Sequence, residues 1–475
     1  MRRTKIIATL GPATDDPAVL EQMIVAGTDV VRINFSHGEW AEHQQRIDLV
    51  RKISAKLGLY VGVLGDLQGP KIRIRRFKES PVELKEGQQC VLDSAMAGDA
   101  GTVEAVGVAY EDLAADVEPG DKLLLDDGHL MLEVENIAGT QIICRVRVGG
   151  KLGNQKGINR HGGGLSAPAL TDKDREDIIF AAKAAVDWVA VSFVRSPDDV
   201  NEARKLLRDA GGSGHIVAKI ERSEAVNNLE AIIDASDAVM VARGDLGVET
   251  GYAGLTGLQK KIIRLARRGH KVTITATQMM ESMIHSQNPT RAEVSDVANA
   301  VMDGTDAVML SAESAIGEYP VKAIATMAEV CEGAEAYRLT SNKLRRNDEH
   351  FEYVDQAIAM AVMYTANHMD VHAIIALTES GSTALWMSRI RSDIPIYAFT
   401  RHEATLRRVS LYRGVYPVLY DVTDSDPDGL YNSIFTRLLD LGQAEEGDLL
   451  IFTKGDMRGV TGGTNAMTVL RLTSQ

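Results

Sequence analysis

The chain has 475 residues, of which 45% are hydrophobic and 25% are charged. This composition is typical of a soluble globular protein and excludes collagen-like, disordered and disulfide-scaffold classes. Lysine and arginine number 52 against 66 aspartates and glutamates, a net charge of −14. Sequence-independent nucleic-acid binding needs a basic surface, so we expect no nucleic-acid partner. The length predicts about three domains.

Cysteine usage and hydropathy argue against zinc-binding, secreted and membrane-spanning proteins. Cys90, Cys144 and Cys331 are far apart, and no CxxC motif or Cys/His cluster indicates a zinc site. The apolar run after the basic N-terminus is about six residues long, too short for a signal-peptide core. No uncharged apolar stretch approaches the ~20 residues of a membrane helix. We therefore expect a cytoplasmic protein with no membrane partner.

Short apolar runs rich in β-branched residues recur along the chain and predict buried parallel strands. Helix-like stretches such as residues 174–186 lie between most of them, which indicates right-handed βαβ units. Eight such strands close a (β/α)8 barrel, the TIM barrel. The predicted strands are residues 5–10, 30–36, 60–67, 188–193, 215–220, 238–243, 272–277 and 307–312.

Two other regions break this alternation. After the third strand come about a hundred residues with short alternating segments and glycine-containing turns, which predict an inserted small β-barrel domain. Because this insertion follows a strand at the barrel's active-site face, we interpret it as a lid. After about residue 340, four strands at 373–378, 396–400, 415–420 and 448–453 alternate with helices and predict an open α/β domain.

The predicted fold class is therefore α/β: a TIM barrel with an inserted β-barrel lid and a C-terminal open α/β domain. The predicted boundaries are residues 1–69 plus 168–338 for the barrel, 70–167 for the lid and 339–475 for the C-terminal domain.

Polar residues at the carboxyl ends of barrel strands are the candidates for chemistry. Arg32, Asn34 and Ser36 share one face of the second strand. Burying them is costly unless a ligand satisfies them or, as the alternative, they form an internal hydrogen-bond network. The seventh and eighth strands end in three further candidates, Thr277, Ser311 and Glu313.

The fifth and sixth strands end in charged residues. Lys219 and Glu221 share one face, and a buried lysine is costly unless it has a partner, so a structural Lys–Glu pair is the alternative to a catalytic role. Asp245 follows Gly244 in an RGDLG turn, which could also be the start of a helix. Glu221 and Asp245 together suit Mg2+, which takes one or two carboxylates plus water and substrate oxygens.

Cations in and near the insertion complete the candidate set. Arg73, Lys151, Lys156 and Arg160 could each be part of a solvated surface. With one metal site and one buried lysine, however, they indicate phosphoryl transfer or an enolate reaction on a phosphorylated or carboxylated substrate.

Several motifs together resemble the pyruvate kinase family, and the resemblance runs along the whole chain. They are RRTKIIATLGPAT, VVRINFSHG, GDLQGPKIR, LDDG, KGIN, VAVSFV, AKIERSEA, VMVARGDLGVE, TATQMMESMI, PTRAEVSDVANAV and DGTDAVMLSAESAIGEYP. The return segment GGGLSAPAL is similar to that of the bacterial type that fructose 1,6-bisphosphate does not activate.

The resemblance implies formation of pyruvate and ATP from phosphoenolpyruvate and ADP, with Mg2+ or Mn2+ as cofactor. It assigns the metal to Glu221 and Asp245, and the phosphoryl group to Lys219 and Arg32. Substrate contacts would come from backbone N–H groups of Gly244 and Asp245 and from Thr277, near the methylene carbon. The remaining implied residues are Arg73 and Lys156 for the ADP phosphates, and Ser311 and Glu313 for the proton path to the enolate.

The chain departs from the family pattern at a monovalent-cation site. Potassium-dependent members carry glutamate where this chain has Lys71. A fixed ammonium there could replace the cation electrostatically, so we expect that K+ is not required. The residues matching this site are Asn34, Ser36, Asp66 and the backbone of Leu67.

A second departure concerns the effector loop of the C-terminal domain. Hydroxyls and N–H groups at a helix start form a phosphate cradle. The chain lacks the tryptophan of fructose 1,6-bisphosphate-activated members, and Glu379 would repel a second phosphate. We expect activation by a monophosphate, a sugar monophosphate or AMP; the alternative is an unused loop. The candidate effector residues are Thr378, Ser380, Gly381, Ser382, Thr383, Thr461, Gly462 and Gly463.

Family members are usually homotetramers, which we expect here as well. Two alternative functions remain open. One is a Mg2+-dependent enolate lyase, which would need no ADP site. The other is a phosphometabolite sensor built on an inactive kinase, which would be expected to lack Lys219, Glu221 or Asp245, and all three are present.

Overall fold

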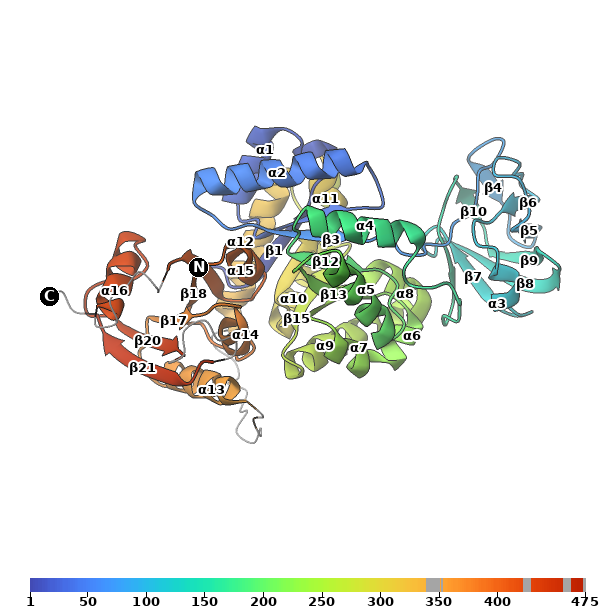
Figure 1. Ribbon diagram of the computed structural model, residues 1–475. Coiled ribbons are helices and arrows are strands. Elements are labelled where there is room, and N and C mark those ends of the chain that lie inside the picture. Colours follow the sequence, from blue (N-terminus) through green and yellow to red (C-terminus); the bar gives the residue numbers. More distant parts are fainter. Residues whose placement is uncertain (339–350, 352, 422–428, 456–462, 473–475) are drawn as a thin grey trace. The chain divides into compact units, whose positions relative to one another are not determined.

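The computed structural model describes residues 1–338, 351, 353–421, 429–455 and 463–472. The chain divides into two compact units. One contains residues 1–65, 184–188 and 266–475, and the other contains residues 66–183 and 189–265. Barrel strands occur in both units (Figure 1).

All eight predicted barrel strands are present, with ends within two residues of the prediction. They pair in the cyclic order β1-β16-β15-β14-β13-β12-β3-β2, which closes the barrel. Neighbours such as β1 and β2 or β13 and β14 are parallel. Every residue of β1 and β14 is buried, which explains their nearly continuous apolar sequences. The strands are β1 (Lys5–Thr9), β2 (Val30–Asn34), β3 (Gly62–Asp66), β12 (Trp188–Val191), β13 (His215–Ile220), β14 (Ala238–Ala242), β15 (Val272–Ala276) and β16 (Ala307–Leu310).

Helices follow the barrel strands, and local sequence signals define several helix ends. Thr290 and Glu293 form a capping box at the start of α10. Gly58, with φ +67°, ends α2 in the left-handed conformation that glycine adopts without strain. The helices are α1 (Pro17–Val25), α2 (Trp40–Leu57), α4 (Asp172–Lys183), α5 (Pro197–Asp209), α6 (Ser223–Asn227), α7 (Leu229–Ala235), α8 (Arg243–Thr250), α9 (Tyr252–Arg268), α10 (Arg291–Asp303), α11 (Ala312–Ala315) and α12 (Pro320–Arg338).

The insertion is an all-β domain with one short helix, α3 (Leu113–Asp116). Its larger sheet has the order β11-β7-β8-β9-β5-β6, and β10 pairs with β4. Arg73 bridges to Gly157 beside one edge strand and Ile74 bridges to Val108 beside the other, so this segment closes the sheet into a small barrel. The strands are β4 (Val82–Leu84), β5 (Gln89–Asp93), β6 (Ala105–Gly107), β7 (Lys122–Leu125), β8 (Leu130–Ala138), β9 (Gln141–Val148), β10 (Gly150–Leu152) and β11 (Ile158–Arg160).

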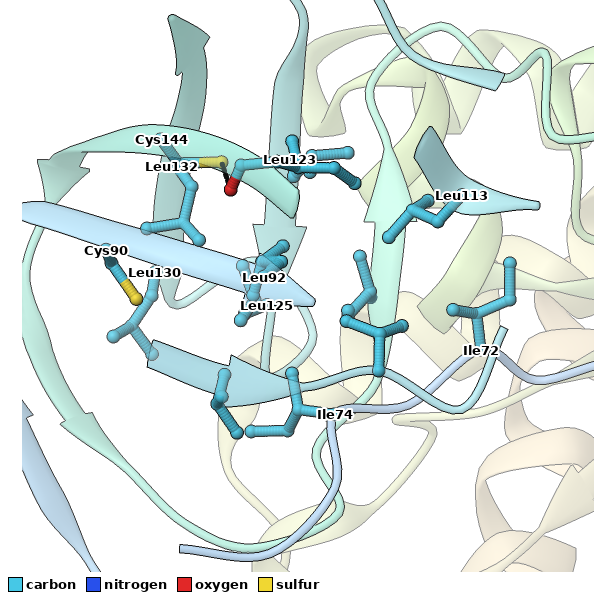
Figure 2. Close-up of a cluster of buried hydrophobic side chains, with 14 of the residues drawn as sticks. Ile72, Ile74, Cys90, Leu92, Leu113, Leu123, Leu125, Leu130, Leu132 and Cys144 are labelled. Atoms are coloured by element: carbon cyan, nitrogen blue, oxygen red, sulfur yellow. Dashed lines mark hydrogen bonds between the residues drawn. The ribbon is translucent and has the colours of Figure 1, made fainter. Parts of the chain in front are cut away.

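The inserted domain has its own hydrophobic core. Figure 2 shows Ile72 and Ile74 packed with Leu92, Leu123 and Leu125 inside it. Alternate residues of each strand supply these side chains, as the period-2 pattern predicts. These side chains form a continuous buried core within the inserted domain.

The C-terminal region is an open α/β sheet with the order β19-β18-β17-β20-β21. Figure 1 shows α13 and α16 on either side of this sheet. The four predicted strands are confirmed, and a fifth, β21, pairs antiparallel with β20 at the edge. The elements are α13 (Val354–Ala366), β17 (Ala373–Leu377), α14 (Ser382–Ser388), β18 (Ile396–Thr400), α15 (Glu403–Val409), β19 (Val415–Leu419), α16 (Leu430–Asp440), β20 (Leu449–Lys454) and β21 (Ala466–Arg471).

No helix in the described part of the chain is long and apolar enough to cross a membrane.

Candidate active site

Lys219 lies at the carboxyl end of β13, and its ammonium contacts three neighbouring side chains. Lys219 Nζ donates to Ser192 Oγ at 2.7 Å and forms ion pairs with Glu221 Oε1 at 3.1 Å and Asp66 Oδ1 at 3.2 Å. The lysine side chain is 11% exposed and the two carboxylate side chains are 3% exposed or less. Two carboxylates and a hydroxyl thus offset the cost of burying this ammonium.

Glu221 is buried, and a backbone group just after the end of another strand, β12, binds its carboxylate. Its Oε2 accepts the backbone N–H of Phe193 at 2.8 Å. Burial raises the pKa of Glu221, and the charges of Asp245 and Asp66 raise it further, whereas Lys219 opposes the shift. Glu221 therefore lies close enough to Asp245 and Asp66 for their charges to disfavour its ionised form, and a nearby cation would offset this repulsion.

Asp245 lies in the first turn of α8, which begins directly after β14. The RGDLG turn is therefore the start of a helix, and N–H groups in a first helical turn have no partner within the helix. The Asp245 carboxylate pairs with Lys71, whose Nζ lies 3.1 Å from Oδ1, and Asp127 Oδ1 lies 3.9 Å from the same ammonium.

The donors suit a magnesium ion that shares its coordination with substrate. Among the described residues, no group of three or more His, Cys, Asp or Glu side chains could hold a metal ion. Glu221 directly follows β13, and Asp245 lies in the helix that follows the next strand, β14, so the two supply carboxylates after consecutive strands. Mg2+ is commonly held by one or two carboxylates while water and phosphate oxygens complete its shell.

The residues predicted for the monovalent-cation site divide between the two units. Asp66 contacts Lys219, and the carbonyl oxygen of Leu67 accepts the hydroxyl of Ser192 at 2.7 Å. In the other unit, Asn34 Oδ1 accepts the backbone N–H of Ser36 at 3.2 Å.

Thr277 and Gln278, at the carboxyl end of β15, have backbone φ angles of +68° and +52°. Such angles are unfavourable for a β-branched residue, and strain of this kind is concentrated at functional sites. The hydroxyl of Thr277 donates to the carbonyl of Ala276 at 2.6 Å. The backbone of this strand end is therefore held in a special conformation that orients Thr277.

Glu313 links the ends of two barrel strands. One carboxylate oxygen accepts the N–H of Ser311 at 2.7 Å and the other accepts the N–H of Met280 at 3.2 Å. The side chain is buried, so Glu313 fixes the segments that follow β15 and β16. Arg32, in the middle of β2, donates from Nη1 to Thr9 Oγ1 at 3.1 Å.

The structure brings the two predicted nucleotide-binding cations to adjacent segments of the inserted domain. Arg73 donates from Nη1 to the carbonyl of Gln155 at 2.9 Å. Lys156 Nζ pairs with Asp126 Oδ1 at 2.7 Å, and its side chain is 43% exposed. Both cations therefore lie on neighbouring segments of this domain, which the bridge between Arg73 and Gly157 joins.

The first part of the predicted effector site is a turn followed by a helix. The N–H of Gly381 donates to Thr378 Oγ1 at 2.9 Å, and Thr383 Oγ1 lies 2.6 Å from Thr464 Oγ1, next to Gly463. Thr461 and Gly462 lie outside the described residues. The carboxylate of Glu379, which we expect to repel a second phosphate, pairs with Arg401 and His402.

The sequence analysis missed Ser192 as a site residue. Its signal was present in the motif VAVSFV, because Ser192 directly follows β12 and so lies at the carboxyl end of a barrel strand. The hydroxyl connects Lys219 to the backbone of Leu67. It is therefore a positioning group for the lysine.

A parallel (β/α)8 barrel with a lysine and two carboxylates at the ends of successive strands defines a class of metal-dependent barrel enzymes. Comparison with known proteins makes this class specific. Residues 1–324 match the model of the pyruvate kinase barrel domain and residues 356–470 match that of the pyruvate kinase alpha/beta domain.

Known relatives match along the whole chain. The chain is 54% identical to pyruvate kinase II of Salmonella typhimurium, over 99% of this chain and 98% of that protein. It is 51% identical to pyruvate kinase of Haemophilus influenzae, over 96% of both chains, and 50% identical to that of Buchnera aphidicola subsp. Schizaphis graminum, over 100% and 99%. The chain belongs to the pyruvate kinase family.

Proposed function

We propose that this protein transfers the phosphoryl group of phosphoenolpyruvate to ADP and forms pyruvate and ATP, the final step of glycolysis. The observation that carries the proposal is the Lys219 ammonium, which is 11% exposed and which Asp66 and Glu221 hold, with the Asp245 carboxylate close enough to Glu221 to interact with it. Phosphoryl transfer requires positioning and charge neutralisation more than covalent chemistry by the protein.

In this proposal, Lys219 neutralises the moving phosphoryl group, and Arg32 binds it from β2. Glu221 and Asp245 hold Mg2+ or Mn2+, which supplies charge neutralisation to the substrate carboxylate and phosphate when bound. Ser192 and Asp66 keep the lysine ammonium in place. These groups are fixed before substrate arrives, so little reorganisation is needed during the reaction.

The remaining residues bind the enolate part of the substrate. Backbone N–H groups of Gly244 and Asp245 in the first turn of α8 bind the carboxylate, since helix starts favour anions. Thr277 lies near the methylene carbon and orients the proton donor. Ser311 and Glu313 belong to the proton path, and the bonds of Glu313 to both strand ends support a positioning role.

ADP would bind to the inserted domain. Arg73 and Lys156 contact its phosphates, and closure of residues 70–167 over the barrel, residues 1–69 and 168–338, assembles the nucleotide site. The support is that these two cations lie on neighbouring segments of one domain.

We also infer that K+ is not required. The Lys71 ammonium lies 3.1 Å from Asp245 and so brings a permanent positive charge to the carboxylates of the site. Two of the four predicted K+ ligands, Asp66 and the carbonyl of Leu67, already bind Lys219 and Ser192.

We propose that the C-terminal domain, residues 339–475, carries an effector site for a sugar monophosphate or AMP. The hydroxyls of Thr378, Ser380 and Ser382 gather within one turn, where Gly381 has a φ of +86°. A side chain at Gly381 would clash with Val409, whose Cγ1 lies 2.7 Å from the position of its Cβ. Saturation curves for phosphoenolpyruvate that glucose 6-phosphate, ribose 5-phosphate and AMP all leave unchanged would refute this.

A cytoplasmic homotetramer is the expected form. Tyr353, Val354 and Tyr364 are 63%, 64% and 59% exposed on or beside α13, and apolar groups in such numbers favour burial against a second copy. Sedimentation of the purified protein tests this expectation, and a monomer at all concentrations would contradict it.

An enolate lyase is the alternative activity, because it would use the same metal and lysine. A coupled assay for both products separates the two. Phosphoenolpyruvate, ADP and Mg2+ should yield pyruvate and ATP in equal amounts if the proposal is correct. Release of pyruvate without ATP, or no turnover with K+ and all effectors present, would contradict it.

A further inference from the structure

Aspartates directly precede the second, fourth, sixth and eighth barrel strands and make the same pair of bonds each time. A side-chain oxygen accepts the N–H of a residue near the start of the preceding strand, and the aspartate N–H donates to the carbonyl of that same residue at 3.0 Å. The four pairs are Asp29–Ile6, Asp187–Val63, Asp237–Ile216 and Asp306–Thr273, with side-chain distances of 2.7, 2.9, 2.8 and 2.8 Å. Each aspartate thus fixes the register between two neighbouring strands.

An arginine pairs with each of these four carboxylates. The arginine partners come from three different places. Arg204 lies on α5, a helix of the barrel itself, and Arg2 lies in the N-terminal segment. Arg407 lies on α15 and Arg389 directly follows α14, so the C-terminal domain supplies two of the four. The pairs are Arg2–Asp29 at 2.8 Å, Arg407–Asp187 at 3.1 Å, Arg204–Asp237 at 2.6 Å and Arg389–Asp306 at 2.7 Å.

The pair of Arg389 and Asp306 is the most deeply buried. Both side chains are 2% exposed or less. Arg389 Nη2 binds the second oxygen of Asp306, and Nη1 also donates to the carbonyl of Lys271 at 2.8 Å. Thr273 also binds the Asp306 carboxylate, since its hydroxyl and N–H both donate to Asp306 Oδ2. A planar guanidinium satisfies this geometry and an ammonium does not.

Arg389 connects the helix that follows the proposed effector turn to two barrel strands that lead to proposed active-site residues. Its helix, α14, begins in the turn that carries the proposed effector hydroxyls. Its partner strands, β15 and β16, end at Thr277 and Ser311. A second helix makes a parallel connection, because α15 carries Arg407 and also Thr405, which donates to the carbonyl of Glu379 in the effector turn at 2.8 Å.

We propose that Arg389 is a positioning residue. It couples the register of β15 and β16 to the conformation of the effector turn, Thr378–Ser382. This inference rests on the proposed function. An effector that shifts α14 moves the guanidinium, which changes the hydrogen bonds of Asp306 to Thr273 and so the placement of Thr277 and Ser311. Arg204, on the barrel helix α5, makes the same kind of bond to Asp237.

Arg204 therefore provides the matched control. We would compare Arg389→Lys and Arg204→Lys in urea unfolding and in saturation by phosphoenolpyruvate, with and without glucose 6-phosphate. Both variants should lose stability. Only Arg389→Lys should change the half-saturating phosphoenolpyruvate concentration and reduce the effector response, each by at least about fivefold.

Three results would overturn the inference. They are an unchanged effector response in Arg389→Lys, an equal loss in Arg204→Lys, and a fall in kcat alone. If Arg389→Lys does not fold, Arg407→Lys replaces it, because Arg407 is 18% exposed and should tolerate the change; it is held to the same criteria. If no effector acts on the wild type, the proposed effector function fails, and the difference in half-saturation between Arg389→Lys and Arg204→Lys still decides this inference.

Discussion

The ammonium of Lys71 lies 3.1 Å from Oδ1 of Asp245, so the residue proposed to replace a monovalent cation pairs directly with a proposed metal ligand. Both belong to a group of charges that includes Asp66, Glu221 and Lys219. A permanent cation in this group lowers the electrostatic cost of its carboxylates. It also means that the proposed Mg2+ site and Lys71 would share the Asp245 carboxylate.

Reversing the charge of Lys71 should create a potassium requirement. We expect K+ to change the activity of the wild type by less than about twofold in tetramethylammonium buffer, because the ammonium already supplies the charge. Lys71→Glu should be nearly inactive without K+ and regain activity when K+ is added. Lys71→Met is the control for loss of the positive charge alone. Strong activation of the wild type by K+ would sink this prediction.

Removal of the Asp245 carboxylate should weaken metal binding. For Asp245→Asn we expect the half-saturating Mn2+ concentration, followed by water proton relaxation, to rise at least ~10-fold because one of two protein carboxylates is lost. Asp127→Asn is the matched control, since Asp127 also faces Lys71, at 3.9 Å, but is no proposed ligand. Equal metal affinity in Asp245→Asn and the wild type would show that the ion binds elsewhere.

Glu249 should make stability depend on pH. This buried side chain accepts the N–H of Ser223 at 2.9 Å, and burial raises its pKa from 4.5 to about 7. The stability associated with the neutral carboxyl is complete below pH 4.5 and is lost as the pH rises through 7. Relative to Glu249→Gln, the wild type should therefore lose about 3 kcal/mol of unfolding free energy over that interval.

Urea unfolding at several pH values measures this difference. The exposed Glu230→Gln variant is the control, and its curve should run parallel to that of the wild type. A constant difference between Glu249→Gln and the wild type from pH 4.5 to 7 would rule out the raised pKa.

The fold could be predicted where a strand is buried on both faces, because such strands are continuous apolar runs. Strands that are buried along their whole length meet this condition, namely β1, β3, β12, β14, β15 and β16 of the barrel and the inner strand β18 of the C-terminal sheet. The edge strand β21 was missed because its residues are half-exposed and show neither a run nor an alternation. Closure of the inserted barrel was predicted, but the single-residue bridges of Arg73 and Ile74 that achieve it carry no periodic signal.

The candidate site could be predicted where its residues are close in sequence. Lys219 and Glu221 share a strand face at a spacing of two, and their ion pair at 3.1 Å follows from that spacing. Contacts between different strands depend on the stagger of the barrel, which periodicity does not encode. For this reason Asp66 was not recognised as a partner of Lys219, and Ser192 was missed.

The most direct test of the account is pyruvate release from phosphoenolpyruvate, ADP and Mg2+, coupled to lactate dehydrogenase in K+-free buffer. Lys219→Met should lower kcat at least ~10²-fold, since it removes the charge placed for the phosphoryl group. Lys205→Met, which changes an exposed lysine paired with Asp209, should match the wild type. A folded Lys219→Met protein with turnover close to that of the wild type would contradict the account.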